Sequence, residues 1–359
     1  MTQNPELSAF LFEHTPWQDE VNPIWPISAF TLHRNLARHN FPPKLQPNQY
    51  AQVLTSLKNS LLSCKELDRP RLIGAEELSA LDKELLFEHF LCFESFQNTT
   101  AGQAFLIDQS AKFLALINIG DHLQIQLLDS SGGWEKSWNI LSKIEGAIAE
   151  TLGVAYSPKF GYLTSDPNIS GTGLIVQVFL HLPALTHTEQ LQEALVKQKE
   201  EEVAAISLQG RIEEIVGDII VLKNGFTLGI SEENILRALH TAAMKFMALE
   251  KNERVRLKNE GSVAIKDQVS RAYGLLLHSY QLQTKETMDA LSLLKLGLDL
   301  GWVTGISDTK LNDILFKCRH AHLSHLSQEK SSDPNQLSHR RAEFIHKELQ
   351  GVSLKTEET

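Results

Sequence analysis

The chain has 359 residues, of which 42% are hydrophobic and 22% are charged, with a formal net charge of −10. Such a chain is typical of a globular protein with one large domain or two, and its acidity argues against a partner that needs a basic surface, such as nucleic acid. No apolar run approaches the ~18 residues of a membrane span, and the N-terminus lacks the pattern of a signal peptide, so we expect a cytoplasmic protein without a membrane partner.

Cysteine and histidine spacing gives no metal pattern. The three cysteines, Cys64, Cys92 and Cys318, are odd in number and widely separated, as reduced thiols of a cytosolic protein would be. His320, His322 and His325 have a spacing that could suit a metal, but no cysteine or carboxylate accompanies them in sequence. We therefore predict that the chain holds no metal ion.

The first half of the chain mixes helix and strand signals. A short helical lead over residues 1–20 precedes a run at 24–36 that begins as a strand and continues with helix-like character. Apolar spacing and turn residues predict the remaining elements of this half. These are helices at 43–64, 78–92 and 134–152, and strands at 103–107, 113–119 and 123–128, the last two joined by a turn at 120–122.

The second half begins with strands and becomes helical. Residues 174–182 form an apolar strand that Pro183 should end, because proline cannot donate to a ladder. We expect a charged helix at 189–205, two strands within 206–228 with an Asn-Gly hairpin signal, and a helix at 231–249. Residues 255–349 are almost entirely helical in pattern. The composition shift near residue 250 predicts an N-terminal lead (1–20), a mixed domain (21–250) and a helical domain (251–359).

The stretch Gly161–His187, GYLTSDPNISGTGLIVQVFLHLPALTH, is the most specific in the chain. The glycines at 171 and 173 allow positive φ and a close approach of a ligand. The amino-acid sequence of this stretch resembles a segment of the guanidino (phosphagen) kinase family, and the closest branch is the bacterial protein-arginine kinases. The likeness runs from about Asn22 to about Leu349. It implies an α+β fold, an antiparallel sheet flanked by helices, followed by a helical C-terminal domain for dimerisation and regulation.

Phosphoryl transfer from ATP to a guanidinium needs clustered cations on the triphosphate and carboxylates on the guanidinium. In the family, arginines grip the phosphates. The resemblance places those arginines at five positions that are neutral in this chain: Ala29, Thr31, Gln124, Ile175 and Gln209. The matching motif also includes Ser28. His89 matches a nucleotide-site histidine and is kept, but one histidine cannot replace five cations.

The guanidinium-binding glutamates of the family are also missing. Their positions are Ile119 and Gly120 here, whereas Asp121 and His122 remain and have plain structural uses in a turn. We therefore predict a protein-arginine kinase homologue that is inactive, has no cofactor and acts as a binding or regulatory protein in protein quality control or stress. The alternative is an active guanidino phosphotransferase that uses ATP with Mg²⁺ in a rebuilt site. That alternative needs arginines from elsewhere, for example Arg34, Arg38 or Arg211.

The C-terminal helices carry a motif like the phosphoarginine pocket of the protein-arginine kinases. The matching run is Leu337-Ser338-His339-Arg340-Arg341, in which the leading Arg-Asp pair is Leu337-Ser338. Three basic side chains in one turn could bind an anion, or could be a solvated basic turn. The resemblance also implies a homodimer, a zinc-binding activator protein and a Clp-type unfoldase as partners.

Overall fold

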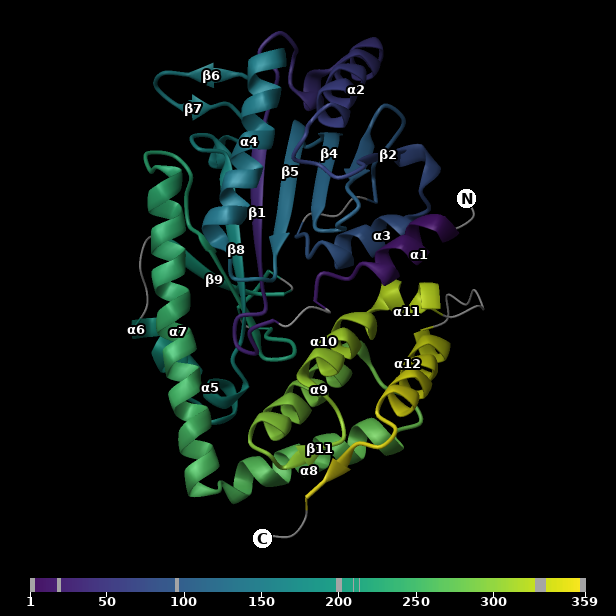
Figure 1. The fold of residues 1–359 in the computed structure, drawn as a ribbon, viewed down its shortest axis with the longest axis vertical. Helices are drawn as coiled ribbons and strands as arrows, with labels where there is room; N and C mark the ends of the chain where they lie inside the picture. The colour runs from purple at the N-terminus through teal and green to yellow at the C-terminus, as the bar shows by residue number, and fades with distance from the viewer. Residues whose placement is uncertain are drawn as a thin grey trace.

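The structure is a computed structural model, and the residues that it describes are 4–17, 21–93, 97–197, 202–208, 210–212, 214–326 and 334–355. The molecule is elongated, with the sheet and its helices in one half and the C-terminal helices in the other (Figure 1). Helix α7 runs down one side and joins the two halves. No helix in the described part of the chain is long and apolar enough to cross a bilayer.

An antiparallel eight-stranded sheet forms the centre of the first half, in the order β2-β3-β4-β5-β1-β8-β10-β9. Its strands are β1 (Ile27–Arg34), β2 (Arg71–Gly74), β3 (Ala104–Ile107), β4 (Phe113–Ile119), β5 (Asp121–Asp129), β8 (Leu174–His181), β9 (Val203–Ser207) and β10 (Ile219–Asn224). Two small ribbons pair β6 (Tyr156–Ser157) with β7 (Gly161–Tyr162) and β11 (Val303–Thr304) with β12 (Ser353–Leu354).

Helices cover both faces of the sheet and make up the second half. They are α1 (Pro5–Glu13), α2 (Pro47–Leu62), α3 (Ala80–His89), α4 (Trp134–Leu152), α5 (Pro183–His187), α6 (Leu191–Lys197), α7 (Glu232–Glu260), α8 (Val263–His278), α9 (Thr284–Asp299), α10 (Asp308–Lys317), α11 (His320–Leu326) and α12 (Pro334–Glu348). Short 3-10 turns lie at Pro42–Lys44, Ala75–Glu77 and Pro167–Ile169.

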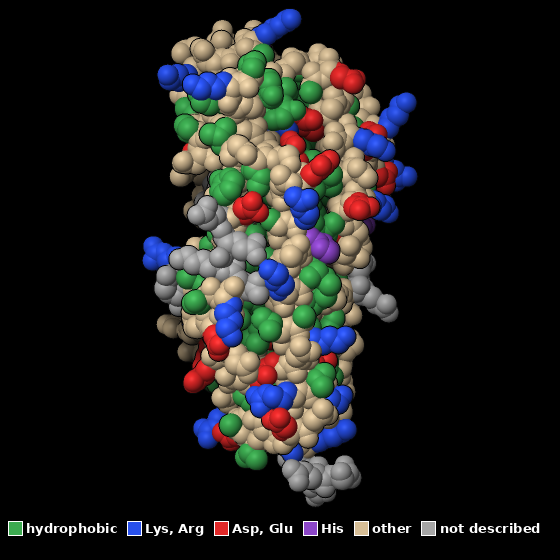
Figure 2. All heavy atoms as spheres, turned by 90° about the vertical axis from the view of Figure 1, so that its left-hand side faces the viewer, with side chains coloured by type: hydrophobic (Ala, Val, Ile, Leu, Met, Phe, Trp, Pro, Cys, Tyr) green, Lys and Arg blue, Asp and Glu red, His purple; other side chains and the backbone are tan. Residues whose placement is uncertain are grey.

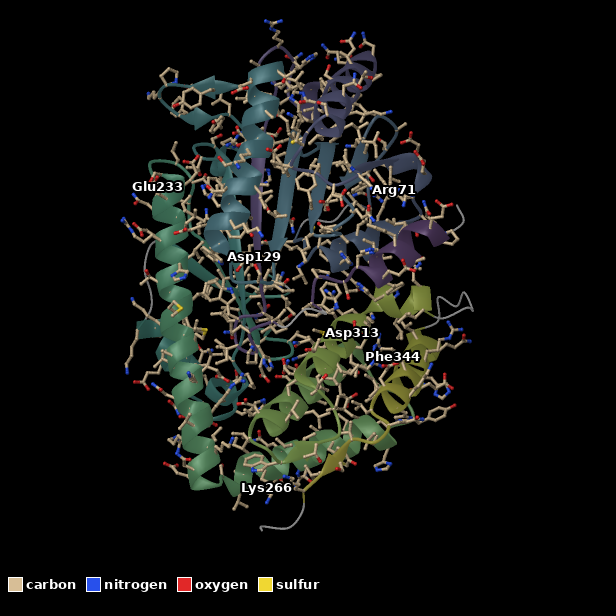
Figure 3. The ribbon with its side chains drawn as sticks, viewed as in Figure 1. Arg71, Asp129, Glu233, Lys266, Asp313 and Phe344 are labelled. Atoms are coloured by element: carbon tan, nitrogen blue, oxygen red, sulfur yellow. The ribbon has the colours of Figure 1, made fainter. Side chains whose placement is uncertain are left out.

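The alternation of side chains along the strands builds two hydrophobic cores. On β1, Phe30 and Leu32 point into the core shared with α2, α4 and α7, whereas Ile27 and Ala29 point to the other face. That second core contains α1, α3 and the C-terminal helices, so the sheet and the helical half are packed as one body. The side chains in Figure 3 fill the space between them, with Phe344 of α12 packed against this core.

The predicted fold class is confirmed: the structure is α+β, with an antiparallel sheet flanked by helices and a helical C-terminal region. The helix-like character expected in the later part of residues 24–36 is wrong, because β1 continues to Arg34. His33 and Arg34 pair with Gln124 and Leu123 of β5, and all eight β1 residues are buried. Tertiary pairing therefore overrides the local pattern.

Two other expectations in this half are corrected. The predicted helix at 189–205 ends at Lys197 within the described residues, and Val203–Ser207 form the edge strand β9 by pairing with β10. Asn224-Gly225 is not a hairpin turn. The Asn224 side chain instead bridges to β8, because Oδ1 accepts from Val176 N at 2.9 Å and Nδ2 donates to Leu174 O at 3.0 Å.

Helix α7 is continuous through residue 250, where the sequence predicts a domain boundary. It ends at Glu260 and is capped by Gly261, which adopts the left-handed conformation with φ of 66°. Beyond it, α8–α12 follow the predicted helical pattern, apart from the small β11–β12 ribbon. Positive and negative side chains are interspersed on the face of the molecule seen from the α7 side (Figure 2).

Candidate functional site

A cavity of about 470 Å³ lies on the sheet face that looks toward the C-terminal half. Its floor is a row of neighbouring side chains, because Thr31 lies opposite Gln126 on β5 and opposite Ile175 on β8, while His33 lies opposite Gln124. Loop residues close its sides. The floor and walls are made by Thr31, His33, Cys92, Phe93, Gln124, Gln126, Asp166, Asn168, Ile169, Ile175, Gln177, Ile206, Gly210, Lys223, Asn224, Gly225, Phe226 and Thr227.

The cavity is polar but nearly uncharged. Among the described residues that line it, Lys223 is the only lysine or arginine. Asp166 is the only acid there, and its Oδ1 accepts from the backbone and side-chain amides of Asn168 at 3.0 Å. The floor therefore offers amides and hydroxyls, which can hydrogen-bond a ligand but cannot neutralise a triphosphate.

The structure brings three of the predicted neutral positions together in this cavity, namely Thr31, Gln124 and Ile175. Ala29 lies on the same face, opposite Gln177, but is fully buried and does not line the cavity. Gln209 is outside the described residues.

The remaining predicted positions lie elsewhere. Ser28 is on the other face of β1, where its hydroxyl accepts from the indoles of Trp25 at 2.9 Å and Trp134 at 3.1 Å. Ile119 and Gly120 form the tight turn between β4 and β5, and Gly120 has φ of 70°. Neither turn residue is among the described residues of the cavity wall.

His89 is a buried structural histidine rather than part of the cavity wall. Its Nε2 donates to Ala111 O at 3.1 Å and its ring packs against Trp17. Burial, together with the neighbouring charges of His322 and Arg319, lowers the pKa of His89 to about 3. The ring is therefore neutral at physiological pH and supplies no cation.

Asp121 is the centre of a buried hydrogen-bond network beside the cavity. Its Oδ1 accepts from Asn35 Nδ2 and from Ser165 N, both at 2.6 Å, and its Oδ2 accepts from His33 Nδ1 at 3.1 Å. Burial alone would raise the pKa of Asp121, but the hydrogen bonds and the charge of His33 outweigh this effect. The pKa of Asp121 therefore lies below its ordinary value of 3.8. A carboxylate held in this way is a poor proton acceptor. The sequence indicates a structural role for it, and the geometry agrees.

Its neighbour His122 is also structural. The ring Nδ1 accepts from Leu36 N at 3.0 Å, and burial lowers the pKa of His122 to about 4. The imidazole is therefore neutral and turned toward backbone, like the other buried polar groups around Asp121.

Arg34 is buried and bound to groups of the protein itself. Its Nε donates to Glu145 at 2.7 Å, Nη1 donates to His33 O at 2.8 Å and Thr172 O at 2.9 Å, and the guanidinium stacks 3.5 Å over the Tyr162 ring. Arg34 thus fixes the Gly171–Gly173 turn onto β1. Arg38 and Arg211 are exposed, and neither they nor Arg34 line the cavity.

The glycines of this turn are required by the protein's own packing. Gly171 has φ of 116°, and a Cβ there would lie 2.2 Å from Thr227 O. Gly173 has φ of 60°, and its Cβ would lie 2.7 Å from His33 O. The predicted positive φ is therefore present at both glycines, but the close approach is made by neighbouring backbone.

The predicted basic turn of the C-terminal half is split between two faces of α12. Arg341 is 2% exposed, and its guanidinium donates to Cys318 O at 2.7 Å and Leu282 O at 2.8 Å. His339 faces outward and contacts Tyr280 O at 2.9 Å. Residues two apart on a helix point about 200° apart, so the three basic side chains do not converge.

The leading positions of this motif are structural as well. Ser338 is buried and its carbonyl accepts from Leu282 N at 3.0 Å, Leu337 is half-buried, and Arg340 is partly exposed. The described donors of Arg341 face the protein interior, so this arginine is not part of a solvated turn; anion binding by the basic turn stays a prediction.

The three histidines of α11 each meet a carboxylate of α3. His320 contacts Glu84 at 2.7 Å, His322 contacts Glu88 at 2.7 Å, and His325 lies 3.5 Å from Asp82. The described residues contain no group of three or more side chains arranged to hold a metal ion. Sequence reasoning missed these pairs because their partners are more than 230 residues away.

Solved structures with this architecture define the class of protein. The duplicated taurocyamine kinase from Schistosoma mansoni superposes with a TM-score of 0.57 at 18% identity, over 69% of this chain and 37% of that one. Lombricine kinase superposes with a TM-score of 0.56 at 17% identity, over 65% of this chain and 70% of that one. The fold is therefore that of the guanidino kinases.

Sequence comparison identifies the family and the branch to which the chain belongs. Residues 52–253 match the ATP:guanido phosphotransferase C-terminal catalytic domain, and residues 262–359 match the protein-arginine kinase McsB C-terminal domain. The protein-arginine kinase of Chlamydia pneumoniae is 33% identical over 93% of this chain and 94% of its own. That of Brevibacillus brevis is 29% identical over 95% and 98%. The chain belongs to the ATP:guanido phosphotransferase family, in its protein-arginine kinase branch.

Proposed function

We propose that this protein is a protein-arginine kinase homologue that has lost phosphotransfer and acts by binding other proteins. The observation that carries the proposal is the neutral floor of the sheet cavity, where Thr31, Gln124 and Ile175 lie side by side. The family resemblance assigns phosphate-binding arginines to these three positions. A cavity floored by amides and hydroxyls leaves the charge of a triphosphate uncompensated.

The size of the expected loss supports this reading. One charge-assisted hydrogen bond contributes about 1.5–3 kcal/mol, so the loss of three such contacts weakens triphosphate binding by several powers of ten. Lys223 is a single, half-exposed cation on the cavity wall. The glutamate positions are Ile119 and Gly120, and the adjacent Asp121 is tied to Asn35, Ser165 and His33.

The alternative, an active phosphotransferase with a rebuilt site, draws no support from the described residues. It needs cations that converge on the cavity. Arg34 contacts the Gly171–Gly173 turn through Thr172 O, and its Nε and Nη1 are used by Glu145 and two carbonyls. Arg38 and Arg211 point into solvent.

The direct test measures nucleotide binding and phosphotransfer. Calorimetry with Mg-ATP should detect no binding at about 1 mM nucleotide, and radiolabelled ATP should transfer no phosphate to an arginine-rich protein substrate. An active protein-arginine kinase run in parallel is the positive control. A micromolar dissociation constant, or label on arginine, would refute the proposal.

Restoring cations gives the matched experiment. Gln124 and Ile175 are half-buried and face the cavity, so the double substitution Gln124→Arg/Ile175→Arg should create measurable, salt-sensitive nucleotide binding. The control is Gln124→Met/Ile175→Met, which changes side-chain shape without adding charge. Equal nucleotide binding by both double variants would show that the neutral charge of the cavity is not the reason for the lost function.

We also propose that the protein is cytoplasmic and forms a homodimer through its helical half. Exposed apolar side chains on this half, Val263 at 81% and Tyr280 at 74%, are consistent with a protein contact. Light scattering at about 20 µM should give twice the chain mass. The zinc-binding activator and the Clp-type unfoldase, expected from the resemblance, are the partners to test by co-purification.

A further inference from the structure

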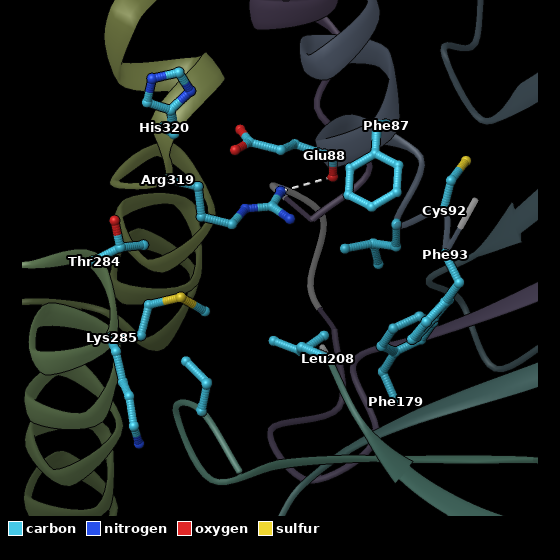
Figure 4. A pocket seen from close by; sticks show the side chains of 13 residues that line it. Phe87, Glu88, Cys92, Phe93, Phe179, Leu208, Thr284, Lys285, Arg319 and His320 are labelled. Carbon is cyan, nitrogen blue, oxygen red and sulfur yellow. Dashed lines mark hydrogen bonds between the residues drawn. The ribbon is translucent and has the colours of Figure 1, made fainter. Parts of the chain in front are cut away.

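A second cavity, of about 270 Å³, lies where the sheet half meets the C-terminal helices. Its walls come from the end of α3, from β8, from the loop between β9 and β10, and from α9 (Figure 4). These walls are largely apolar. They are formed by Phe87, Leu91, Cys92, Phe93, Phe179, Leu208, Val216 and Met288.

One guanidinium reaches into this apolar space. Arg319, at the junction of α10 and α11, extends across the cavity toward Phe87 in Figure 4. Its Nε donates to Phe316 O at 3.0 Å and its Nη2 donates to Glu88 O at 2.7 Å. These bonds fix the plane of the guanidinium and use two of its five N–H groups. Among the described residues, the structure gives Nη1 no hydrogen-bond partner.

The acid beside this guanidinium is turned away from the cavity. Both oxygens of the Glu88 carboxylate accept from α11: Oε1 from Ala321 N at 3.1 Å, and Oε2 from His322 N at 3.1 Å and His322 Nδ1 at 2.7 Å. Figure 4 shows this carboxylate on the His320 side of Arg319. The Glu88 carboxylate is therefore hydrogen-bonded by α11. The charge of Arg319 also acts on it, but among the described residues no hydrogen bond from Glu88 occupies Nη1 of Arg319.

The other cations on the wall are already engaged. Lys285 donates to Ile215 O at 3.1 Å and Asp289 at 3.2 Å, and Figure 4 shows its ammonium pointing away from the cavity. His320 is paired with Glu84 at 2.7 Å. Of the described lining residues, Arg319 is thus the cation with donors available to a ligand.

We propose that this cavity binds a small organic monocarboxylate with an aromatic or branched apolar body. The carboxylate accepts from Nη1 of Arg319, and the apolar body lies among Phe93, Phe179 and Met288. A fixed guanidinium at an apolar wall selects a singly charged acid, because the second charge of a phosphate would be desolvated without a second cation. The volume suits a ligand of one ring rather than a nucleotide.

A bound acid would link the two halves of the molecule, since its contacts come from α3, β8, α9 and the α10–α11 junction. The site shares Cys92 and Phe93 with the sheet cavity but has its own charge and its own apolar walls. The inference therefore holds whether or not the sheet cavity binds a nucleotide.

The test compares an acid with its amide. Calorimetry on the full chain with 3-phenylpropionate should give a dissociation constant below about 1 mM, and 3-phenylpropanamide should bind at least about tenfold more weakly. Acetate, which has the charge without the apolar body, should not bind at the same concentration. Equal binding of acid and amide, or no binding of the acid at about 10 mM, overturns the proposal.

Two variants locate the site. Leu208 is a half-buried wall residue, so Leu208→Trp should fill the cavity and weaken the acid at least about tenfold. Arg319→Gln should abolish the preference for acid over amide. Because Arg319 also joins α3 to α10, the fold of the Arg319→Gln variant is checked by thermal denaturation. If this variant is unfolded, Leu208→Trp and the comparison of acid with amide test the proposal.

The matched control is Lys285→Met, which removes a cation from the cavity rim and keeps the aliphatic chain. Since the Lys285 ammonium is engaged by Ile215 O and Asp289, its loss should leave the affinity for 3-phenylpropionate unchanged within about twofold. A loss as large as that of Leu208→Trp would assign binding to general surface charge and refute the role of Arg319.

Discussion

Two neighbouring regions of this protein differ in their charged side chains: one contains several, and the other contains few. Beneath the Gly171–Gly173 turn, Arg34, Asp121 and Glu145 are basic or acidic side chains whose hydrogen-bond partners are backbone or side chains of the protein. A few residues away, the sheet cavity presents Gln124 and Ile175 where the family resemblance expects arginine. The two regions share β1 and β5, so the difference lies in which way each side chain points.

The comparison indicates that charge is retained where it holds the backbone and is absent where it would face a ligand. Arg34 and Asp121 each satisfy several buried groups, so their loss leaves unpaired polar atoms in the interior. Among the described residues the structure gives the Gln124 side chain no hydrogen-bond partner, so its loss should leave no buried group unpaired. The experiments below measure this contrast, beginning with the largest expected effect.

Asp121→Ala should be the most destabilising single change. It removes the acceptor for Asn35 Nδ2, Ser165 N and His33 Nδ1 and leaves buried donors unpaired, at a cost of about 3–5 kcal/mol in the free energy of unfolding. Urea denaturation measures the loss. A change below about 1 kcal/mol would mean that the network contributes little.

Arg34→Met should cost somewhat less, about 2–4 kcal/mol, because Glu145 can turn toward solvent when its partner is lost. The methionine keeps most of the apolar contact with Tyr162, so the loss reports on the hydrogen bonds to Glu145 and Thr172 O. Glu145→Gln, which keeps a hydrogen-bond acceptor for Arg34, is the milder partner variant. A larger loss for Glu145→Gln would contradict the role given to the guanidinium.

Acid should weaken the protein through its paired carboxylates. The folded pKa of Asp121 lies below its ordinary value of 3.8, and that of Glu88 is about 2 against an ordinary 4.5. For Glu88, burial alone would raise the pKa, but the hydrogen bond from His322 and the charges of Arg319 and His322 lower it.

Both folded pKa values lie below the unfolded ones, so these groups add stability above the unfolded pKa. That stability is lost as the pH falls through about 4 toward 2. Denaturation of wild type and Glu88→Gln at a series of pH values tests this: the variant should lose less stability over that range. Parallel curves for the two proteins would show that Glu88 does not contribute.

Gln124→Ala should have the smallest effect, within about 0.5 kcal/mol, because the side chain lies half-buried on the cavity floor. It is also the matched control for Asp121→Ala, since both residues are on β5. A loss comparable with that of Asp121→Ala would remove the contrast between the two regions.

Much of the fold follows from local pattern. The helices around 43–64, 134–152 and 231–249, the strand that ends before Pro183 and the turn after β4 are all present near their predicted positions. These signals are local: apolar spacing, capping residues and proline act within a few residues of themselves. The neutral positions Thr31, Gln124 and Ile175 were also predicted from the sequence, through its resemblance to the family's motifs.

The failures have a common cause in tertiary contacts. The strand character of His33 and Arg34 depends on pairing with β5, about 90 residues away. The direction of Arg341 depends on carbonyls of Cys318 and Leu282, which lie on other elements. No local sequence pattern predicts such distant partners. The sequence therefore indicates one basic turn, whereas in the structure its basic side chains lie on different faces of α12.

The sequence by itself determined the positive-φ glycines at 171 and 173, because positive φ is a property of residue type and near neighbours. The class of fold and the neutral cavity positions also came from the sequence, through its resemblance to the family. Only the tertiary structure decided which charges are free. It paired the α11 histidines with α3, enclosed Arg341, and left Arg319 facing an apolar cavity. Whether a charged side chain is bound or available depends on groups distant in sequence that packing brings within hydrogen-bond distance.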